Sequence, residues 1–356
     1  MLLNGLRVLD LSQFLPGPLA TRTLSDLGAD VIKIEPPRGD PMRKLLCDDD
    51  NQVSDVYRIV NYGKRVVRLD LKQDAAKQEL SDLIEKTDVL LESFRPGVLE
   101  RLGFGYETCT SLNPKLVYCS LSGYGQNGPY KYQAGHDINY CAAAGFVNQD
   151  SCDAGKQFAF PPLADHTGAM LAAHSILAAL YSTQTTGRGH YLDVSIYESM
   201  LAFQYINVID AEKSGVLYSD FLGGGAACYN LYKTKDQKYI TLGAVEEHFW
   251  TNFCNAMERP DWIERQFEPF PQKDLIQEVG VLFLKRDLKD WNEKLLEVDC
   301  CYEPVMDFGR HPQHHQSQSR KLISGKQPGY PAWIDQQCVP QQKPIEYLDN
   351  LKAANW

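Results

Sequence analysis

The stretch that decides the fold is residues 6–35, LRVLDLSQFLPGPLATRTLSDLGADVIKIE. It opens with a short apolar run that predicts a β-strand. Residues 16–18, Pro-Gly-Pro, predict a turn, and residues 19–27 carry apolar side chains at helical spacing until Gly28 ends the helix. Residues 31–35 predict a second strand, so the stretch is typical of a parallel βαβ unit.

Further apolar segments continue this pattern. Residues 66–70, 89–92 and 116–120 predict strands that alternate with helical segments, which indicates a doubly wound α/β sheet. A dinucleotide cofactor would need a G-x-G-x-x-G motif after the first strand. Residues 12–18, SQFLPGP, hold one glycine between prolines, so we expect neither NAD nor FAD.

Length and composition limit the class of protein. The chain has 356 residues, more than one hydrophobic core usually organises, so two domains are expected. A content of 44% hydrophobic and 23% charged residues is typical of a soluble globular protein, and the formal net charge of -10 argues against nucleic-acid binding. The longest apolar stretch, residues 169–181, is too short for a membrane span, and the first residues lack a signal-peptide pattern. We therefore expect a cytoplasmic protein.

The second half of the chain differs in composition and hydrophobic pattern. Residues 167–184 are rich in small side chains and predict a buried helix. From about residue 210 a strand and a mostly helical segment, residues 267–296, predict a second, smaller domain that ends near residue 325. The tail from residue 312 is rich in Gln, Pro and His, and we expect an extended wrap or a partner-contacting arm.

The cysteines give no sign of a metal site. Ten cysteines include no C-x-x-C pair, and the adjacent Cys300 and Cys301 cannot easily serve one structural metal. The histidines of the tail lack further ligands nearby. We expect reduced thiols and no bound metal.

Residues of three kinds are candidates for proton chemistry. His136 lies in the segment Gly135-His136-Asp137-Ile138-Asn139-Tyr140, and an imidazole titrates at about pH 6.5 with little tuning. Asp165 precedes the predicted buried helix, where an aspartate ordinarily serves as a cap and has a depressed pKa. Glu246 is a carboxylate within an apolar and aromatic run. The alternatives are a hydrogen-bonded loop histidine, a simple helix cap and a solvated glutamate.

Basic residues that suit phosphate groups occur at two places. Lys64, Arg65 and Arg68 follow Asn-Tyr-Gly, and Arg95 lies in Phe-Arg-Pro-Gly. Ordinary surface charge is the alternative interpretation for each of them.

Several of these segments match a known family. The chain resembles the family III CoA-transferase fold over almost its whole length, through residues 5–11, 27–35, 64–72, 92–98 and 118–128. Within that superfamily it is most similar to the α-methylacyl-CoA racemases, through residues 135–140, 224–226 with Tyr229, and 243–246.

The resemblance implies a Rossmann-like large domain and a smaller α+β domain in an interlocked homodimer. The large, CoA-binding domain would comprise residues 1–205, completed by the segment 326–356, and the small domain with its linkers residues 206–325. The substrate would be a CoA thioester, with no permanently bound cofactor. The active site is expected between the large domain of one subunit and the small domain of the other.

The resemblance also assigns CoA-binding residues. Arg95 is expected to approach the CoA phosphates, and Lys64 and Arg65 are weaker candidates for the same role. Tyr124 and Gly125, in the matching segment 118–128, are expected to contribute to CoA binding.

In the racemase reaction, His136 and Asp165 would exchange the α-proton of a 2-methylacyl-CoA on opposite faces, with Glu246 orienting the imidazole. Because this proton is only weakly acidic, preorganised donors must stabilise the enolate oxygen. The site would then accept either enantiomer.

One segment departs from the racemase pattern. Residues 161–168, PPLADHTG, place Asp165 in an Asp-x-x-Gly setting closer to the transferases. In a transferase, Asp165 would attack the acyl-CoA, form a mixed anhydride and then an aspartyl-CoA thioester, and pass CoA to a carboxylic acid. A third interpretation, a non-catalytic acyl-CoA binder, is disfavoured because all three candidate residues are present.

Overall fold

The computed structural model describes residues 1–47, 53–147, 161–215, 217–307, 309–310, 313–324, 327–340, 343–354 and 356. The chain forms two compact units. Unit 1 comprises Met1–Gln204 and Gln318–Trp356, and unit 2 comprises Tyr205–Ser317. Each unit has its own hydrophobic core.

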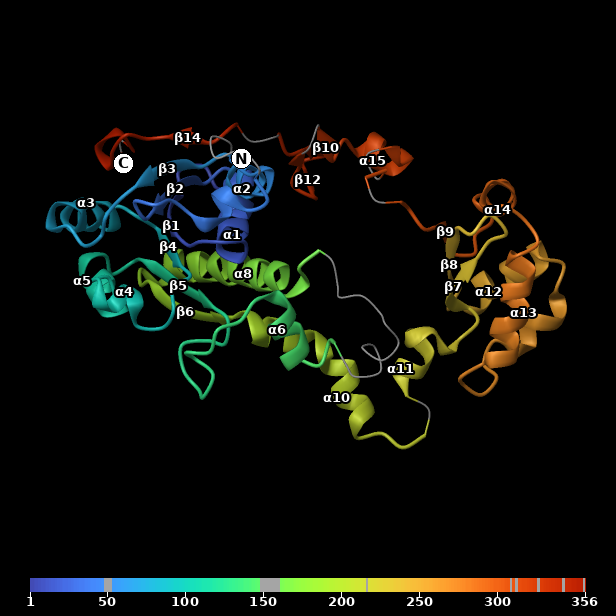
Figure 1. The fold of residues 1–356 in the computed structure, drawn as a ribbon. Coiled ribbons are helices and arrows are strands. Elements are labelled where there is room, and N and C mark those ends of the chain that lie inside the picture. The colour runs from blue at the N-terminus through green and yellow to red at the C-terminus, as the bar shows by residue number, and fades with distance from the viewer. Residues whose placement is uncertain are drawn as a thin grey trace. The chain divides into compact units, whose positions relative to one another are not determined.

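Unit 1 is built on a seven-stranded sheet in the order β14-β3-β2-β1-β4-β5-β6, in which every pairing is parallel (Figure 1). Its elements up to residue 204 are β1 Arg7–Leu11, α1 Pro16–Asp26, β2 Asp30–Glu35, η1 Pro41–Lys44, α2 Asp55–Asn61, β3 Arg65–Arg68, α3 Asp74–Ile84, β4 Val89–Glu92, α4 Val98–Arg101, α5 Tyr106–Leu112, β5 Val117–Ser122, α6 Asp137–Ala143, α8 Leu163–Thr186, β6 His190–Ser195, α9 Ile196–Leu201 and η2 Ala202–Gln204. The predicted parallel α/β sheet is confirmed.

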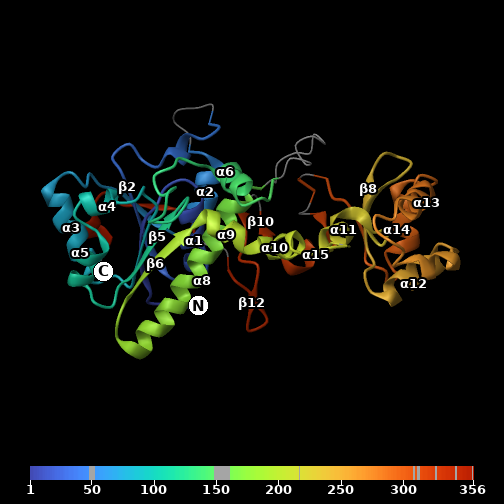
Figure 2. The ribbon, with the colours of Figure 1, turned by 90° about the horizontal axis from the view of Figure 1, so that it is seen from below.

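Helices cover both faces of the sheet. Because successive side chains of a strand point to opposite faces, each strand contributes to the core on either side. Val8 packs into a core with α1, α6, α8 and α9, whereas its neighbour Leu9 packs into a core with α3, α4 and α5. Helix α8 lies beside α1 and β6 (Figure 2). The buried apolar runs of β1, β2, β4 and β5 follow from this two-sided burial.

The segment at residues 16–18 is not a separate turn. Pro16 begins helix α1 directly, and Leu15 is its N-cap. The prediction was wrong here because a proline in the first helical turn loses no hydrogen bond and has a suitable φ angle.

The C-terminal segment returns to unit 1. Strand β14, Glu346–Tyr347, pairs in parallel with β3 at one edge of the sheet (Figure 1). The short 3₁₀ helix η6, Leu351–Ala354, contributes Leu351 to the core that includes α3. The remaining elements here are β10 Ile323–Ser324, β11 Gln327–Pro328, β12 Trp333–Ile334 and β13 Gln337–Cys338, with α15 His315–Arg320 spanning the boundary of the units.

Unit 2 contains a three-stranded antiparallel sheet in the order β7-β8-β9. Its elements are α10 Tyr205–Ala211, α11 Tyr218–Asp220, η3 Phe221–Gly225, β7 Tyr229–Lys233, β8 Tyr239–Gly243, α12 Glu247–Ala256, η4 Pro260–Arg265, α13 Lys273–Phe283, α14 Leu288–Leu295 and β9 Tyr302–Pro304. The sheet packs against helices through a core that contains Trp250, Trp262 and Trp291. The indole N–H groups of Trp250 and Trp291 donate to backbone carbonyls, as in the 2.9 Å bond from Trp250 to Trp262, and that of Trp262 donates to Oε2 of Glu278 at 2.9 Å.

Candidate functional site

A cavity of about 440 Å³ opens in unit 1 and brings several predicted residues together. Its lining includes Arg95, Tyr124, His136 and Asp165. These residues come from the segments after β4 and β5, the start of α6 and the start of α8. The carboxyl ends of the parallel strands and the N-termini of two helices therefore meet at this cavity, which is the usual position of a ligand site in such a sheet.

Asp165 lies in the first turn of α8 and is half-buried. Its backbone N–H donates to Oδ1 of Asp137 at 3.0 Å, so a second carboxylate lies beside it. Burial, and then the negative charge of Asp137, raise the pKa of Asp165 to about 7. The expected depression of this pKa was wrong, because the cost of desolvating the carboxylate outweighs the helix dipole.

His136 is the N-cap residue of α6 and is exposed at the cavity. Its backbone N–H donates to Oδ1 of Asn139 at 3.0 Å, which fixes the start of the helix. The imidazole meets the ring of Phe14 edge to face, with centroids 6.4 Å apart and an interplanar angle of 79°.

Tyrosine rings form one wall of the cavity. Tyr140 donates its hydroxyl to the carbonyl of Gly135 at 2.7 Å, and burial followed by the Asp165 charge raises the pKa of Tyr140 to about 12. Tyr124 packs edge to face on Tyr140 at 5.2 Å. The Tyr140 hydroxyl therefore stays protonated at neutral pH, and its hydrogen bond to Gly135 anchors the backbone next to His136.

Arg95 is the predicted CoA-binding cation that lies at the cavity. Its side chain is exposed and forms no ion pair with any residue that the structure describes. It also lines a neighbouring cavity of about 230 Å³. Gly125 does not line the main cavity, and its φ of 83° instead makes the turn that lets Gln126 N–H reach Asp193 at 3.1 Å.

Lys64 is not available to a phosphate, which corrects the expectation from sequence. Its ammonium group is fully buried and donates to Asp10 at 3.0 Å, to the Pro18 carbonyl at 2.7 Å and to Asn61 at 2.9 Å. Burial lowers the pKa of Lys64 to about 8, although the Asp10 carboxylate opposes the shift. All of its donors are used inside the protein.

Arg65 is likewise engaged within unit 1. Its guanidinium pairs with Asp30 at 2.6 Å and donates to the carbonyl of Ala354 in the C-terminal segment. It also lies 5.8 Å from the ring centroid of Trp356. This arrangement fastens the C-terminal segment to the sheet and leaves the cation away from the cavity lining.

Glu246 lies in unit 2, where it is the exposed N-cap residue of α12. The preceding turn is fixed by Gln266, whose side-chain amide donates to the carbonyls of Ala244 at 3.3 Å and Val245 at 2.8 Å. The backbone that leads into Glu246 is therefore held by hydrogen bonds within unit 2.

Some residues of the site were not predicted from the sequence. Asp137 follows His136 directly and contacts Asp165, and the sequence signal for it is a charged residue beside a candidate base. Gln13 and Lys131 also line the cavity. They lie in loops without a pattern of their own.

The described residues contain no group of three or more His, Cys, Asp or Glu side chains placed to hold a metal ion. Within the same part of the chain, no helix has the length and apolar character needed to cross a bilayer.

Comparison with known proteins identifies the family. Residues 3–344 match the model of CoA-transferase family III. The chain is 30% identical to an alpha-methylacyl-CoA racemase of Mus musculus over 99% of this chain and 88% of that protein. It is 35% identical to a succinyl-CoA:mesaconate CoA-transferase of Haloarcula hispanica over 99% of this chain and 91% of that protein. The crystal structure of Rv3272 from Mycobacterium tuberculosis superposes with a TM-score of 0.83 at 26% identity, covering 99% of this chain and 98% of that one. The chain therefore belongs to CoA-transferase family III, whose relatives include both racemases and CoA-transferases.

Proposed function

We propose that the protein racemises 2-methylacyl-CoA thioesters by 1,1-proton transfer at the α-carbon. The observation that carries the proposal is that the His136 imidazole and the Asp165 carboxyl line one cavity. The pKa of Asp165 is raised to about 7. A group that titrates near neutral pH both accepts and returns a proton readily, which a racemase needs from each of its bases.

The cavity also offers groups for the other parts of this reaction. Gln13, Lys131 and Asn139 on its wall supply N–H groups that would stabilise the enolate oxygen. Arg95 would bind the CoA phosphates from the cavity edge. The thioester would then lie with its α-carbon between His136 and Asp165.

The second candidate is CoA transfer through Asp165, which similarity to the Haloarcula hispanica enzyme favours. The Asp-x-x-Gly spacing is weaker support, since Gly168 has a packing role: a Cβ there would lie 2.9 Å from Cγ1 of Ile196. A raised pKa also leaves Asp165 partly protonated at neutral pH, which weakens it as a nucleophile.

The decisive experiment is NMR of a 2-methylacyl-CoA in D₂O, with and without a free carboxylic acid as CoA acceptor. Exchange of the α-proton without the acceptor, lost in Asp165→Asn, supports racemisation. If exchange is absent and a new acyl-CoA forms only with the acceptor, the racemase proposal is wrong and the transferase takes its place.

We also propose the interlocked homodimer, in which Glu246 of the partner subunit orients His136. Coexpression of His136→Ala and Glu246→Ala chains tests it. If sites are shared between subunits, mixed dimers contain one native site, and about a quarter of the activity returns. If each site is made by one chain, no activity returns. The cytoplasmic location stays a prediction.

A further inference from the structure

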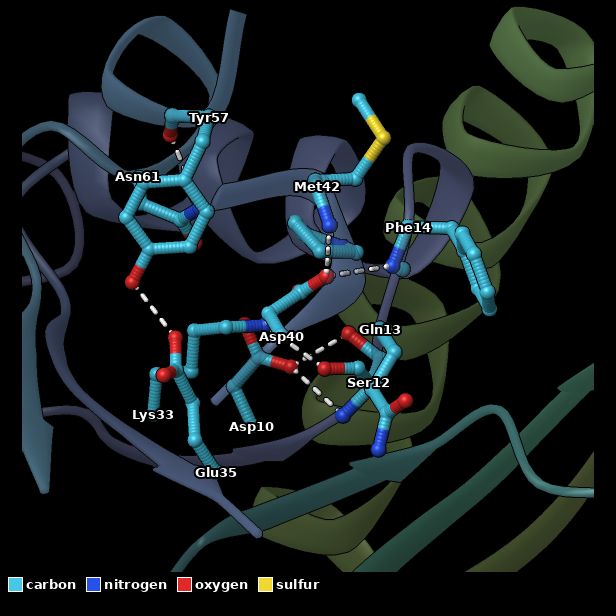
Figure 3. A network of polar contacts seen from close by, with 12 residues as sticks. Asp10, Ser12, Gln13, Phe14, Lys33, Glu35, Asp40, Met42, Tyr57 and Asn61 are labelled. Carbon is cyan, nitrogen blue, oxygen red and sulfur yellow. Dashed lines mark hydrogen bonds and ion pairs between the residues drawn. The ribbon is translucent and has the colours of Figure 1, made fainter. Parts of the chain in front are cut away.

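The loop between β1 and α1 is tied to the rest of unit 1 through its backbone. Gln13 N–H donates to the hydroxyl of Ser93 at 3.0 Å, after β4. Phe14 N–H donates to Oδ1 of Asp40 at 3.3 Å, after β2 (Figure 3). Two consecutive backbone amides of this loop thus donate to side chains that lie after two other strands. These two hydrogen bonds fix the position of the loop.

Asp40 is itself held by a buried ion pair. Its Oδ2 lies 3.1 Å from Nζ of Lys33, and neither side chain is exposed. Lys33 also donates to the carbonyl of Ser12 at 2.6 Å, and Asp40 accepts from Met42 N–H at 2.9 Å (Figure 3). Because turning either side chain would leave an uncompensated buried charge, Asp40 is a fixed acceptor for the Phe14 amide.

Phe14 has a backbone conformation that its own side chain does not favour. Its φ is 65°, in the left-handed region that a bulky residue rarely adopts, and its side chain is 47% exposed. Burial of the ring therefore does not account for the conformation. In this conformation the Phe14 ring makes its edge-to-face contact with His136 at the cavity.

We propose that Phe14, anchored by Asp40, is a positioning residue that restricts the rotamers of the His136 imidazole from within the same chain, in addition to the orienting role proposed for Glu246 of the partner subunit. This inference rests on the proposed function, in which His136 serves one face of the α-carbon. When the anchor is lost, Phe14 relaxes toward negative φ, its ring leaves the imidazole, and His136 samples several rotamers. Proton transfer on the His136 face then slows, while the Asp165 face is unaffected.

The test compares Phe14→Gly and Asp40→Ala, which removes the acceptor of the Phe14 amide, with a matched control, Leu46→Gly. Leu46 also has a positive φ, 52°, but its side chain is 94% exposed and it does not line the cavity. The control therefore relieves a left-handed backbone conformation at a residue outside the cavity lining. Exchange of the α-proton in D₂O is measured separately for each enantiomer of the substrate, and His136→Gln identifies the enantiomer that depends on His136.

We expect both test variants to slow exchange of the His136-dependent enantiomer about tenfold or more, since small misplacements of a base are costly. The other enantiomer should change less than about twofold, and Leu46→Gly should match the wild type. Equal loss for both enantiomers, or no loss, overturns the inference.

A second readout does not need catalysis. The ¹Hε1 resonance of His136 senses the ring current of Phe14, so it should move in Phe14→Gly and Asp40→Ala and stay in place in Leu46→Gly. If the wild type shows no α-proton exchange, the proposed function fails, and this resonance alone decides the inference. If Asp40→Ala does not fold, the wild-type Phe14 amide is measured instead: slow hydrogen exchange supports the anchor, and exchange at the rate of an unbonded amide overturns it.

Discussion

Replacing Asp165 by asparagine should stabilise the protein at alkaline pH while removing its activity. Folding raises the pKa of Asp165 from 3.8 to about 7, through burial first and the Asp137 charge second. A carboxyl with a raised pKa contributes stability that is fully present below pH 3.8 and is lost as the pH rises through about 7. At 1.36 kcal/mol for each pH unit, the whole loss is about 4 kcal/mol. Between pH 5 and pH 8 the loss is about 2.5 kcal/mol.

The assay is thermal unfolding of wild type and Asp165→Asn at pH 5 and pH 8. Asparagine does not ionise, so the Tm of the variant relative to wild type should rise by roughly 5–10 °C between the two pH values. Asp74→Asn is the control, because Asp74 also lies in the first turn of a helix, α3, with a fully exposed side chain. Its Tm difference from wild type should be the same at both pH values.

Asp137→Asn separates the two causes of the shift. Removing the neighbouring charge lowers the pKa of Asp165 but leaves its burial, so the stability lost between pH 5 and pH 8 should become smaller without vanishing. A Tm difference between wild type and Asp165→Asn that is the same at pH 5 and pH 8 would contradict the raised pKa, because it would mean that Asp165 is ionised throughout this range.

Other predictions follow from single contacts. Lys64→Met should destabilise the protein by about 3–5 kcal/mol in denaturant unfolding, because it leaves the buried Asp10 carboxylate without its partner. An unchanged stability together with a raised KM would instead indicate that Lys64 binds a CoA phosphate. Arg95→Gln should raise the KM for an acyl-CoA about tenfold and leave the KM for the matching N-acetylcysteamine thioester unchanged, since the short thioester has no phosphates. An equal effect on both substrates would argue against a phosphate contact. Gly168→Ala should cost about 1–3 kcal/mol through its clash with Ile196. The control Gly280→Ala, also within a helix, has only an ordinary 3.9 Å contact and should be neutral or stabilising.

Much of the fold was predictable because it depends on local pattern. The buried apolar runs of β1, β2, β4 and β5 identify strands without any knowledge of their neighbours, since a parallel strand is covered on both faces. The start of α1 was not predictable from the Pro-Gly-Pro signal, because proline suits both a turn and a first helical turn.

In the candidate site, residue type and local pattern were enough to indicate side chains suited to proton chemistry, His136 and Asp165 above all. It is the fold that brings both residues to one cavity and sets the pKa of Asp165. The sequence around Lys64 is compatible with a surface cation, but folding places Asp10 of β1 against it. The position of Asp165 is typical of an ionised helix cap, but burial raises its pKa. The physical reason is that hydrophobic periodicity is a local property of the chain. The free energy of a charge depends instead on the solvent and partners that folding leaves around it, and those partners come from distant parts of the sequence.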